Sequence, residues 1–325
     1  MTAYLARRVL QAIPLLFALA MLNFALVRLA PGDPIAYLVG DAGADPQLAA
    51  RLRASLGLDR PLLEQFFAYV GNLAHLDLGV SLFYRRPVID VLMERVPATV
   101  TLMTAQLLLA ILIGIPAGVL AARRRNGATD SVISSLAVVG FSVPVFWSAQ
   151  MLILFFAVQL RILPSGGMTD SRTTYTGIEY AADVARHLAL PAFTLALVQT
   201  ALIARITRAS MADVLSRDFV VTARAKGLAE RAVVWRHALR NSMLPIVTVL
   251  GLEFGQIFAG QIVTETVFSW PGIGRLMFES ISRRDYPVIM GGFLLAALGV
   301  LVANLVTDLA YARLDPRIRI GRRQG

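Results

Sequence analysis

Residues 96–122 read VPATVTLMTAQLLLAILIGIPAGVLAA, a stretch without a single charged side chain. A helix needs about 20 mostly apolar residues to cross the hydrocarbon core of a bilayer, so this stretch predicts a transmembrane helix. Other stretches are equally free of charge, and one more is interrupted only by Glu253; they are 9–27, 131–160, 187–204, 286–307 and, with the glutamate, 242–264. The sequence therefore predicts an all-α, polytopic membrane protein with six transmembrane helices.

The stretch 131–160 is longer than one span requires, and Ser142-Val143-Pro144 is the only polar turn that could divide it. Proline is common in membrane helices, so we expect one long, kinked helix here and not a hairpin. In the stretch 96–122, Gly114 and Gly118 flank Pro116. This pattern predicts a kink and a close contact with another helix.

The composition agrees with a membrane protein. The chain is 57% hydrophobic and 16% charged, and its mean hydropathy is +0.65, whereas a soluble domain is about one quarter charged. The net charge of +10 could indicate nucleic-acid binding, but the arginines lie between the apolar stretches. The segments that would face one side hold 18 of the Lys and Arg residues against five acids, namely 1–8, 123–130, 205–241 and 312–325. The positive-inside rule then places both termini in the cytoplasm, and nucleic acid is not expected as a partner.

The first stretch is expected to remain in the protein as a span. Arg7 and Arg8 could begin a signal peptide, but the apolar run that follows is too long and no Ala-x-Ala site comes after it. The next segment, 31–95, is expected to be a small external helical cap. Asp45-Pro46 and Asp59-Arg60-Pro61 are typical helix starts, and Gly57 is a typical helix stop. Helical spacing places several apolar side chains of the cap on one face, namely Leu62, Phe66, Val70 and Leu73.

We therefore divide the chain into a first span at 1–30, the external segment 31–95, a five-helix core at 96–311 and a cytoplasmic tail at 312–325. The core contains the long cytoplasmic loop 211–241.

Signs of covalent chemistry are missing from the sequence. Lys226 is the only lysine, and Gly227 follows it, so the chain has no Gly-Lys-Ser/Thr phosphate-binding motif. The three histidines, His75, His187 and His237, are far apart in the sequence, and there is no cysteine. We expect no catalytic residue, no metal and no cofactor bound by this chain.

The loop 211–241 carries the most informative motif. It reads DFVVTARAKGLAE at 218–230 and continues with HALRNSMLP at 237–245. The pattern predicts two short helices, 211–226 and 228–240, broken at Gly227, because glycine tolerates backbone angles that other residues avoid. A plain positive-inside loop beside the lipid headgroups is the alternative.

This loop resembles the EAA loop of membrane subunits of ABC importers, and in particular the B-type permease subunit of the dipeptide, oligopeptide and nickel group. The resemblance extends over further motifs in the same order, namely PGDP at 31–34, LGLDRP at 56–61, DLGVS at 77–81, SVPVFW at 142–147, WPGIG at 270–274 and LDPR at 314–317. The chain departs from the general EAA pattern in two places. Val221-Thr222-Ala223 stands where the pattern has Glu-Ala-Ala, and the first proline of the loop comes only at Pro245.

The resemblance implies the type I ABC importer permease fold in a bacterial inner membrane. It implies a related second permease subunit, two cytoplasmic ATP-binding subunits that use the ATP, an external solute-binding protein and contact with membrane lipid. It also assigns ATPase docking to residues of the loop, for which we select Thr222, Ala223, Lys226, Gly227, Leu228 and Pro245. The solute would be a dipeptide, an oligopeptide, glutathione or a nickel chelate.

Polar residues within the spans are candidates for the solute path. Glu253 lies in the middle of a span, Gln256 lies one turn on, and Gly260 follows. An acid at this depth usually faces water or the interior of a bundle. The alternative is packing, with Gly251 and Gly255 allowing a close helix contact and Glu253 bonded to a neighbour. Asn304 and Asp308, one turn apart, are expected to bond between helices.

Trp270 raises a similar choice. A tryptophan at the end of a span is often an anchor at the membrane surface, whereas the resemblance implies a re-entrant turn at the pore mouth, which we favour. For the whole chain, a stand-alone secondary transporter and a membrane scaffold or receptor are the rival functions. Secondary transporters often contain inverted repeats and buried ion-coupling charges, and we find no clear repeat here.

Overall fold

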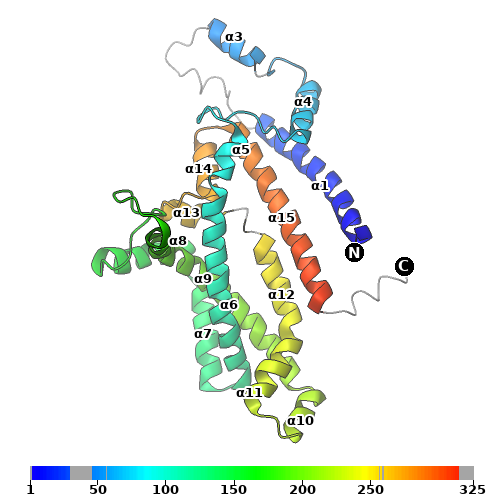
Figure 1. Ribbon diagram of the computed structural model, residues 1–325, viewed down its shortest axis with the longest axis vertical. Coiled ribbons are helices and arrows are strands. Elements are labelled where there is room, and N and C mark those ends of the chain that lie inside the picture. The colour runs from blue at the N-terminus through cyan, green and yellow to red at the C-terminus, as the bar shows by residue number, and fades with distance from the viewer. Residues whose placement is uncertain (1, 30–45, 56, 256, 258–259, 315–325) are drawn as a thin grey trace. The chain divides into compact units, whose positions relative to one another are not determined.

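The computed structural model describes residues 2–29, 46–55, 57–255, 257 and 260–314. These residues are helical with connecting turns, and they include no β-strand beyond an isolated bridge between Val80 and Pro87. The all-α prediction is confirmed. The helices (Figure 1) are α1 (Thr2–Leu29), α3 (Pro46–Ser55), α4 (Leu62–Ala74), α5 (Val88–Met93), α6 (Val96–Arg123), α7 (Ala128–Ser142), α8 (Val145–Leu152), η1 (Ile153–Gln159), α9 (Gly177–Leu215), α10 (Asp218–Ala225), α11 (Glu230–Ala232), η2 (Val233–Ala238), α12 (Leu239–Gly255), α13 (Ile262–Val267), α14 (Ile273–Ser282) and α15 (Tyr286–Leu314).

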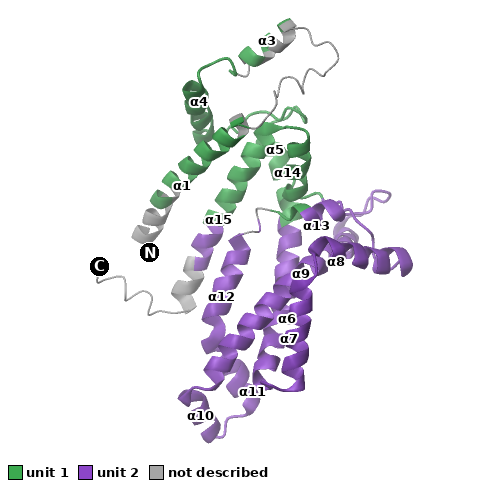
Figure 2. Cartoon of the chain, turned by 180° about the vertical axis from the view of Figure 1, so that it is seen from behind, with its two compact units in different colours: residues 1–99, 258–262, 271–301 green, residues 100–257, 263–270, 302–325 purple. Residues whose placement is uncertain are grey.

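The chain forms two compact units (Figure 2). Unit 1 consists of residues 1–99, 258–262 and 271–301, and unit 2 consists of residues 100–257, 263–270 and 302–325. Each unit is assembled from segments that are far apart in the sequence.

Helix α9 is the centre of unit 2 and packs against α7, α8 and α12. It also contacts α6 closely. A Cβ atom on Gly118 would lie 2.5 Å from the Ala204 carbonyl oxygen and 2.5 Å from the Thr207 Cβ, and one on Gly114 would lie 3.0 Å from Ile203. Only glycine allows the two backbones to approach this far, so the predicted close contact at Gly114 and Gly118 is confirmed.

The prediction of one long, kinked helix over 131–160 is wrong. Helix α7 ends at Ser142, and α8 with η1 continues after a bend of 100°. Val143 is extended, with φ −80° and ψ 127°. The residue before a proline avoids the helical region and the proline itself lacks an N–H group, so the chain leaves the helix at this point.

The prediction of one span over 242–264 is also wrong, because this stretch is not one continuous helix. Helix α12 has 17 residues and ends at Gly255, whereas α13 begins at Ile262. Between them Gly260 has a φ of +72°, which an α-helix cannot contain.

Three helical segments of the described residues are long and apolar enough to cross a membrane, namely Val88–Arg123, Gly177–Leu215 and Tyr286–Thr307. The bent pair α7 and α8–η1 provides a fourth candidate, and the apolar part of α1 is the shorter Ile13–Leu26. The total of six spans therefore stays a prediction.

Unit 1 contains the cap helices. Helix α3 begins at Pro46 and α4 follows Pro61, as the two helix-start signals in the sequence predicted. Between these helices, Gly57 has a φ of +63°. Phe66 of α4 contacts Phe17 and Phe24 of α1 edge-on, with ring centroids 5.7 and 5.5 Å apart. Helix α4 of the cap thus packs against α1.

A buried carboxylate fixes the adjoining turn of unit 1. Asp285 accepts hydrogen bonds from the Ser81 hydroxyl at 2.5 Å and from the backbone N–H groups of Leu82 and Phe83 at 3.1 and 3.2 Å.

Candidate functional site

The loop after α9 is a folded helical element. Figures 1 and 2 place α10 and α11 at the end of unit 2 where α6 turns into α7. The predicted helix 211–226 is wrong as a single element, because α9 runs on to Leu215 and a turn at Ser216 and Arg217 precedes α10. The predicted separate helix 228–240 is wrong too, since α11 and η2 lead without a break into α12.

Gly227 forms the break that the sequence predicted. Its φ is +75°, and it follows the last residues of α10. The Gly227 N–H donates to the Arg224 carbonyl at 2.9 Å, and the Leu228 N–H donates to the Ala223 carbonyl at 3.4 Å. This pair of bonds is a Schellman motif, in which a left-handed residue ends a helix. A Cβ on Gly227 would meet no atom within 4 Å, so the requirement for glycine comes from the backbone angle and not from crowding.

An ion pair spans the same turn. The Arg224 guanidinium donates to both oxygens of Glu230, from Nη2 at 2.9 Å and from Nε at 3.1 Å. These hydrogen bonds lower the pKa of the Glu230 carboxyl and raise that of Arg224. Both side chains are about half exposed, so the pair ties the ends of the turn together without burying charge.

Apolar packing holds the loop to the rest of unit 2. Val220 and Ala223 of α10 pack with Val233 of η2, and Leu215 lies against them. A second cluster joins η2 to α6 and α9 through Val119, Ala122, Met211, Val214, Val234 and Ala238. A movement of the turn would therefore be passed to the helices through buried side chains.

The structure divides the predicted docking residues. Thr222, Lys226, Gly227 and Leu228 are exposed near the turn, whereas Ala223 is only 9% exposed and belongs to the internal cluster. The expectation that Ala223 packs directly against a partner is therefore not supported by its position. Pro245 is exposed but lies inside α12, away from the turn in the sequence.

The loop also exposes apolar side chains that were not selected from the sequence. Val221 of α10 is 59% exposed, and Trp235 of η2 is also exposed. Helical periodicity could have identified Val221, because Val220 and Ala223 occupy the buried face of α10.

Of the predicted path residues, the structure describes Glu253 and Gly260, which belong to different units. Glu253 is 9% exposed in α12, and its carboxylate accepts a hydrogen bond from the Gln199 side-chain amide of α9. Gly260 belongs to unit 1, and Gln256 lies outside the described residues. The contacts of Glu253 are thus those of the packing alternative.

The opposite face of α12 confirms a close contact through small residues. A Cβ on Gly251 would lie 2.2 Å from Thr307 Cγ2, and one on Gly255 would lie 3.6 Å from Ala303 Cβ, both in α15. Asn304 is exposed, so interhelical bonding of its side chain is not seen, and the Asp308 side chain lies outside the described residues.

Trp270 is fully buried, so the membrane-surface anchor is excluded. The backbone N–H of Trp270 donates to the Glu265 carbonyl at 2.8 Å, and the backbone N–H of Gly167 donates to the Phe268 carbonyl at 2.8 Å. Trp270 thus belongs to a buried turn between the short helices α13 and α14, and the re-entrant turn at the pore mouth stays a prediction.

Comparison with known proteins gives a consistent result. The profile of the family described as "Binding-protein-dependent transport system inner membrane component" matches residues 114–320, and that of the corresponding N-terminal region matches residues 1–103. The chain is 43% identical to the di/tripeptide transport system permease protein DppB of Pseudomonas aeruginosa, with 98% of this chain and 99% of the relative covered. It is 41% identical to the dipeptide permease protein DppB and 43% identical to the glutathione permease protein GsiC of Escherichia coli, with the same coverage.

A solved structure of the MetNI methionine ABC transporter in inward-facing conformations is similar in fold. The TM-score is 0.54 at 15% identity, with 70% of this chain and 97% of that chain covered.

Proposed function

The chain belongs to the family of binding-protein-dependent transport system inner membrane components, and from this premise we propose that it forms half of a pathway for peptides across a bacterial inner membrane. It is a permease subunit of an ABC importer. The names of its relatives specify dipeptides, tripeptides and glutathione, which share a peptide bond and a free carboxylate. A peptide of this size is therefore the proposed solute, with a nickel chelate as the alternative.

The exposed turn at Gly227 is the observation that carries the mechanism. We assign it to docking in a groove of an ATP-binding subunit. The turn presents Lys226, Gly227 and Leu228 to solvent, while the buried side chains behind it pack on α6 and α9. Closure of the ATPases would move the turn, and the packed clusters would pass the movement to the helices. The ATPase contact thus stabilises one state of the pathway over the other.

The proposed assembly contains this chain, a related second permease subunit, two ATP-binding subunits and an external solute-binding protein. A heterodimeric pore agrees with the B-type resemblance, and both termini are assigned to the cytoplasm from the charge asymmetry. The chain itself would hydrolyse no ATP, because its only lysine, Lys226, comes before a glycine, whereas the lysine of a Gly-Lys-Ser/Thr motif comes after one.

Reconstitution tests this function against a secondary transporter. The chain is co-expressed with its partners, purified through a tag on this chain and placed in proteoliposomes. We expect an ATP-binding subunit to co-purify and labelled dipeptide uptake to require ATP. Uptake that runs without ATP and responds to an ion gradient would show a secondary transporter instead. A preparation of the chain alone that hydrolyses ATP would contradict the non-catalytic role.

A further inference from the structure

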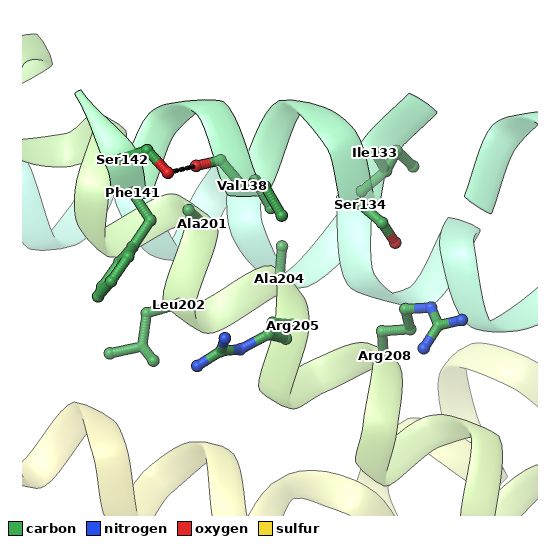
Figure 3. A pocket seen from close by; sticks show the side chains of 11 residues that line it. Ile133, Ser134, Val138, Phe141, Ser142, Ala201, Leu202, Ala204, Arg205 and Arg208 are labelled. Atoms are coloured by element: carbon green, nitrogen blue, oxygen red, sulfur yellow. Dashed lines mark hydrogen bonds between the residues drawn. The ribbon is translucent and has the colours of Figure 1, made fainter. Parts of the chain in front are cut away.

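A groove of about 350 Å³ lies along α7 and α9 in unit 2 (Figure 3). This size is within the range of roughly 300–1,000 Å³ that is typical of sites for small molecules. The lining is mainly apolar and includes Ile133, Val138, Phe141 and Leu202. Phe141 is 62% exposed, and its neighbour Val138 is exposed as well, so hydrocarbon surface is left uncovered by this chain.

Most polar groups in the lining already have partners within the chain. The Ser142 hydroxyl donates to the Val138 carbonyl at 2.8 Å, as Figure 3 shows, and the Ser134 hydroxyl donates to Asp130 at 3.3 Å. Arg208 donates to both oxygens of Asp130, from Nε at 2.5 Å and from Nη2 at 2.7 Å. The charge of Arg208 is therefore balanced, and neither hydroxyl proton is available to a ligand.

Arg205 is different. No hydrogen bond or ion pair of its guanidinium is seen within the described residues, and the side chain is exposed in the groove. Figure 3 shows its guanidinium pointing toward the Leu202 and Phe141 end, whereas Arg208 points toward the other end. The groove thus offers one cation beside hydrocarbon. A ligand that fits must bring one anionic group and an otherwise apolar body.

The level of the groove in the membrane fits such a ligand. The charge-free stretch of α9 ends at Ala204, so Arg205 comes directly after it on the side that the charge asymmetry assigns to the cytoplasm. Basic pockets between transmembrane helices on this side bind anionic lipid headgroups. We propose that the groove binds an anionic phospholipid of the cytoplasmic leaflet, with its phosphate on Arg205 and an acyl chain along Val138, Phe141 and Leu202.

A peptide fits the same surface less well. Its amide and amino groups would lose water against apolar side chains, and the serine hydroxyl protons are already used. A second permease subunit could also cover the groove, but it would have to supply an acid opposite Arg205. These two occupants give different results in the test below.

The chain contains no cysteine, so a single one can report on the groove. Leu202→Cys is labelled with bimane, and the purified full chain is placed in phosphatidylcholine nanodiscs. The quenching by brominated phosphatidylglycerol is compared with that by brominated phosphatidylcholine at equal mole fraction. Leu136→Cys is the matched control, because Leu136 is exposed on α7 but does not line this groove.

We expect phosphatidylglycerol to be preferred about fivefold at Leu202, the factor associated with one Arg near an anionic surface, and no preference at Leu136. Arg205→Gln should remove the preference and Arg205→Lys should keep it. Raising the salt concentration should weaken it in the unsubstituted chain, which tests the charge even if Arg205→Gln fails to fold.

Equal quenching by the two lipids, or a preference that survives Arg205→Gln, would overturn the proposal. So would displacement of the lipid by millimolar dipeptide or inorganic phosphate, which would identify a site for solute or free phosphate. Loss of the quenching when the second permease subunit is added would assign the groove to that subunit. The test needs no ATPase, so its failure would leave the proposed transport function unaffected.

Discussion

Arg224 and Glu230 clasp the exposed turn at Gly227 through two hydrogen bonds, at 2.9 and 3.1 Å, between the end of α10 and the start of α11. The pair is half exposed, and such surface pairs contribute about 0.2–1 kcal/mol. The Schellman motif and the apolar cluster behind the turn therefore determine its shape, and the ion pair adds to them.

Glu230→Gln should accordingly have a small effect. It removes the charge of the acceptor but keeps its size, so we expect the affinity for the ATP-binding subunit to fall by less than about fivefold. The measurement is ATPase binding to the reconstituted variant. Arg217→Gln is the control, because Arg217 forms a comparable exposed pair with Asp213, away from the turn at Gly227. A complete loss of binding in Glu230→Gln would show that the glutamate contacts the partner directly.

The ion pair should not make docking depend on pH near neutrality. Because the pKa of Glu230 is lowered, its stabilising contribution is fully present above the usual glutamate pKa of about 4.3 and is lost only as the pH falls through the lowered value. The raised pKa of Arg224 keeps its contribution until strongly alkaline pH. We expect ATPase binding to be constant between about pH 6 and pH 8. A step in this range would have to come from another group.

Gly227→Val should weaken docking strongly. A residue with a side chain pays roughly 1–2 kcal/mol in the left-handed region, and a β-branched one is among the least tolerant. Uptake and solute-stimulated ATP hydrolysis should fall together while the chain still purifies as a folded protein. Gly227→Asn is the matched control, since asparagine adopts this conformation readily and the space around the Cβ is open. Equal activity of Gly227→Val and Gly227→Asn would mean that the turn conformation does not matter for coupling.

Ala223→Asp should disturb the loop itself. Its side chain would enter the cluster of Val220 and Val233, where an unpaired charge costs several kcal/mol. We expect faster proteolysis at Arg224 or Lys226 even in the chain alone, before any partner is added. Thr222→Asp is the control, because Thr222 is exposed one residue away. If Ala223→Asp left the protease sensitivity unchanged but abolished ATPase binding, the residue would act at the interface after all.

Local signals in the sequence predicted where helices begin and end better than how the helices pack. Pro46, Gly57, Pro61 and Gly227 mark helix ends where the sequence indicated them, because each acts through its own backbone angles. Val143 and Pro144 account for the break after α7, but hydropathy alone cannot distinguish a kink from the bend of 100° that follows. Ala149 of α8 packs with Leu190 and Phe268, which are far away in the sequence.

The candidate site shows the same limit. The sequence located the loop and its glycine, but the burial of Ala223 depends on Val233, which is ten residues further along the chain. The partner of Glu253 is Gln199, in a different helix, and a single sequence carries no signal for that pairing.

The predicted topology can be tested on the same cysteine-free chain. The positions Ala44 and Gly167 should face outward and Gly127 inward, but Ala44 lies outside the described residues and Gly167 has a φ of +85°. Ser171→Cys and Arg125→Cys are better reporters, because both side chains are exposed in loops of unit 2. In intact cells an impermeant maleimide should label Ser171→Cys alone, and permeabilised cells should label both. The reverse pattern would invert the orientation.

The bond between Gln199 and Glu253 predicts a structural role for the glutamate. Both side chains lie between α9 and α12, and Glu253 is 9% exposed. Glu253→Leu should destabilise the chain by about 1–3 kcal/mol, because the Gln199 amide loses its partner within the bundle. Gln199→Leu should cost a similar amount. The double variant should cost less than the sum of the two single variants, because neither partner of the hydrogen bond is then left unpaired. Thermal unfolding in detergent measures this coupling.

Glu253→Gln should keep the hydrogen bond and keep dipeptide uptake within about twofold of the unsubstituted transporter. Additive single effects together with a large loss of uptake in Glu253→Gln would instead place the carboxylate in the solute path.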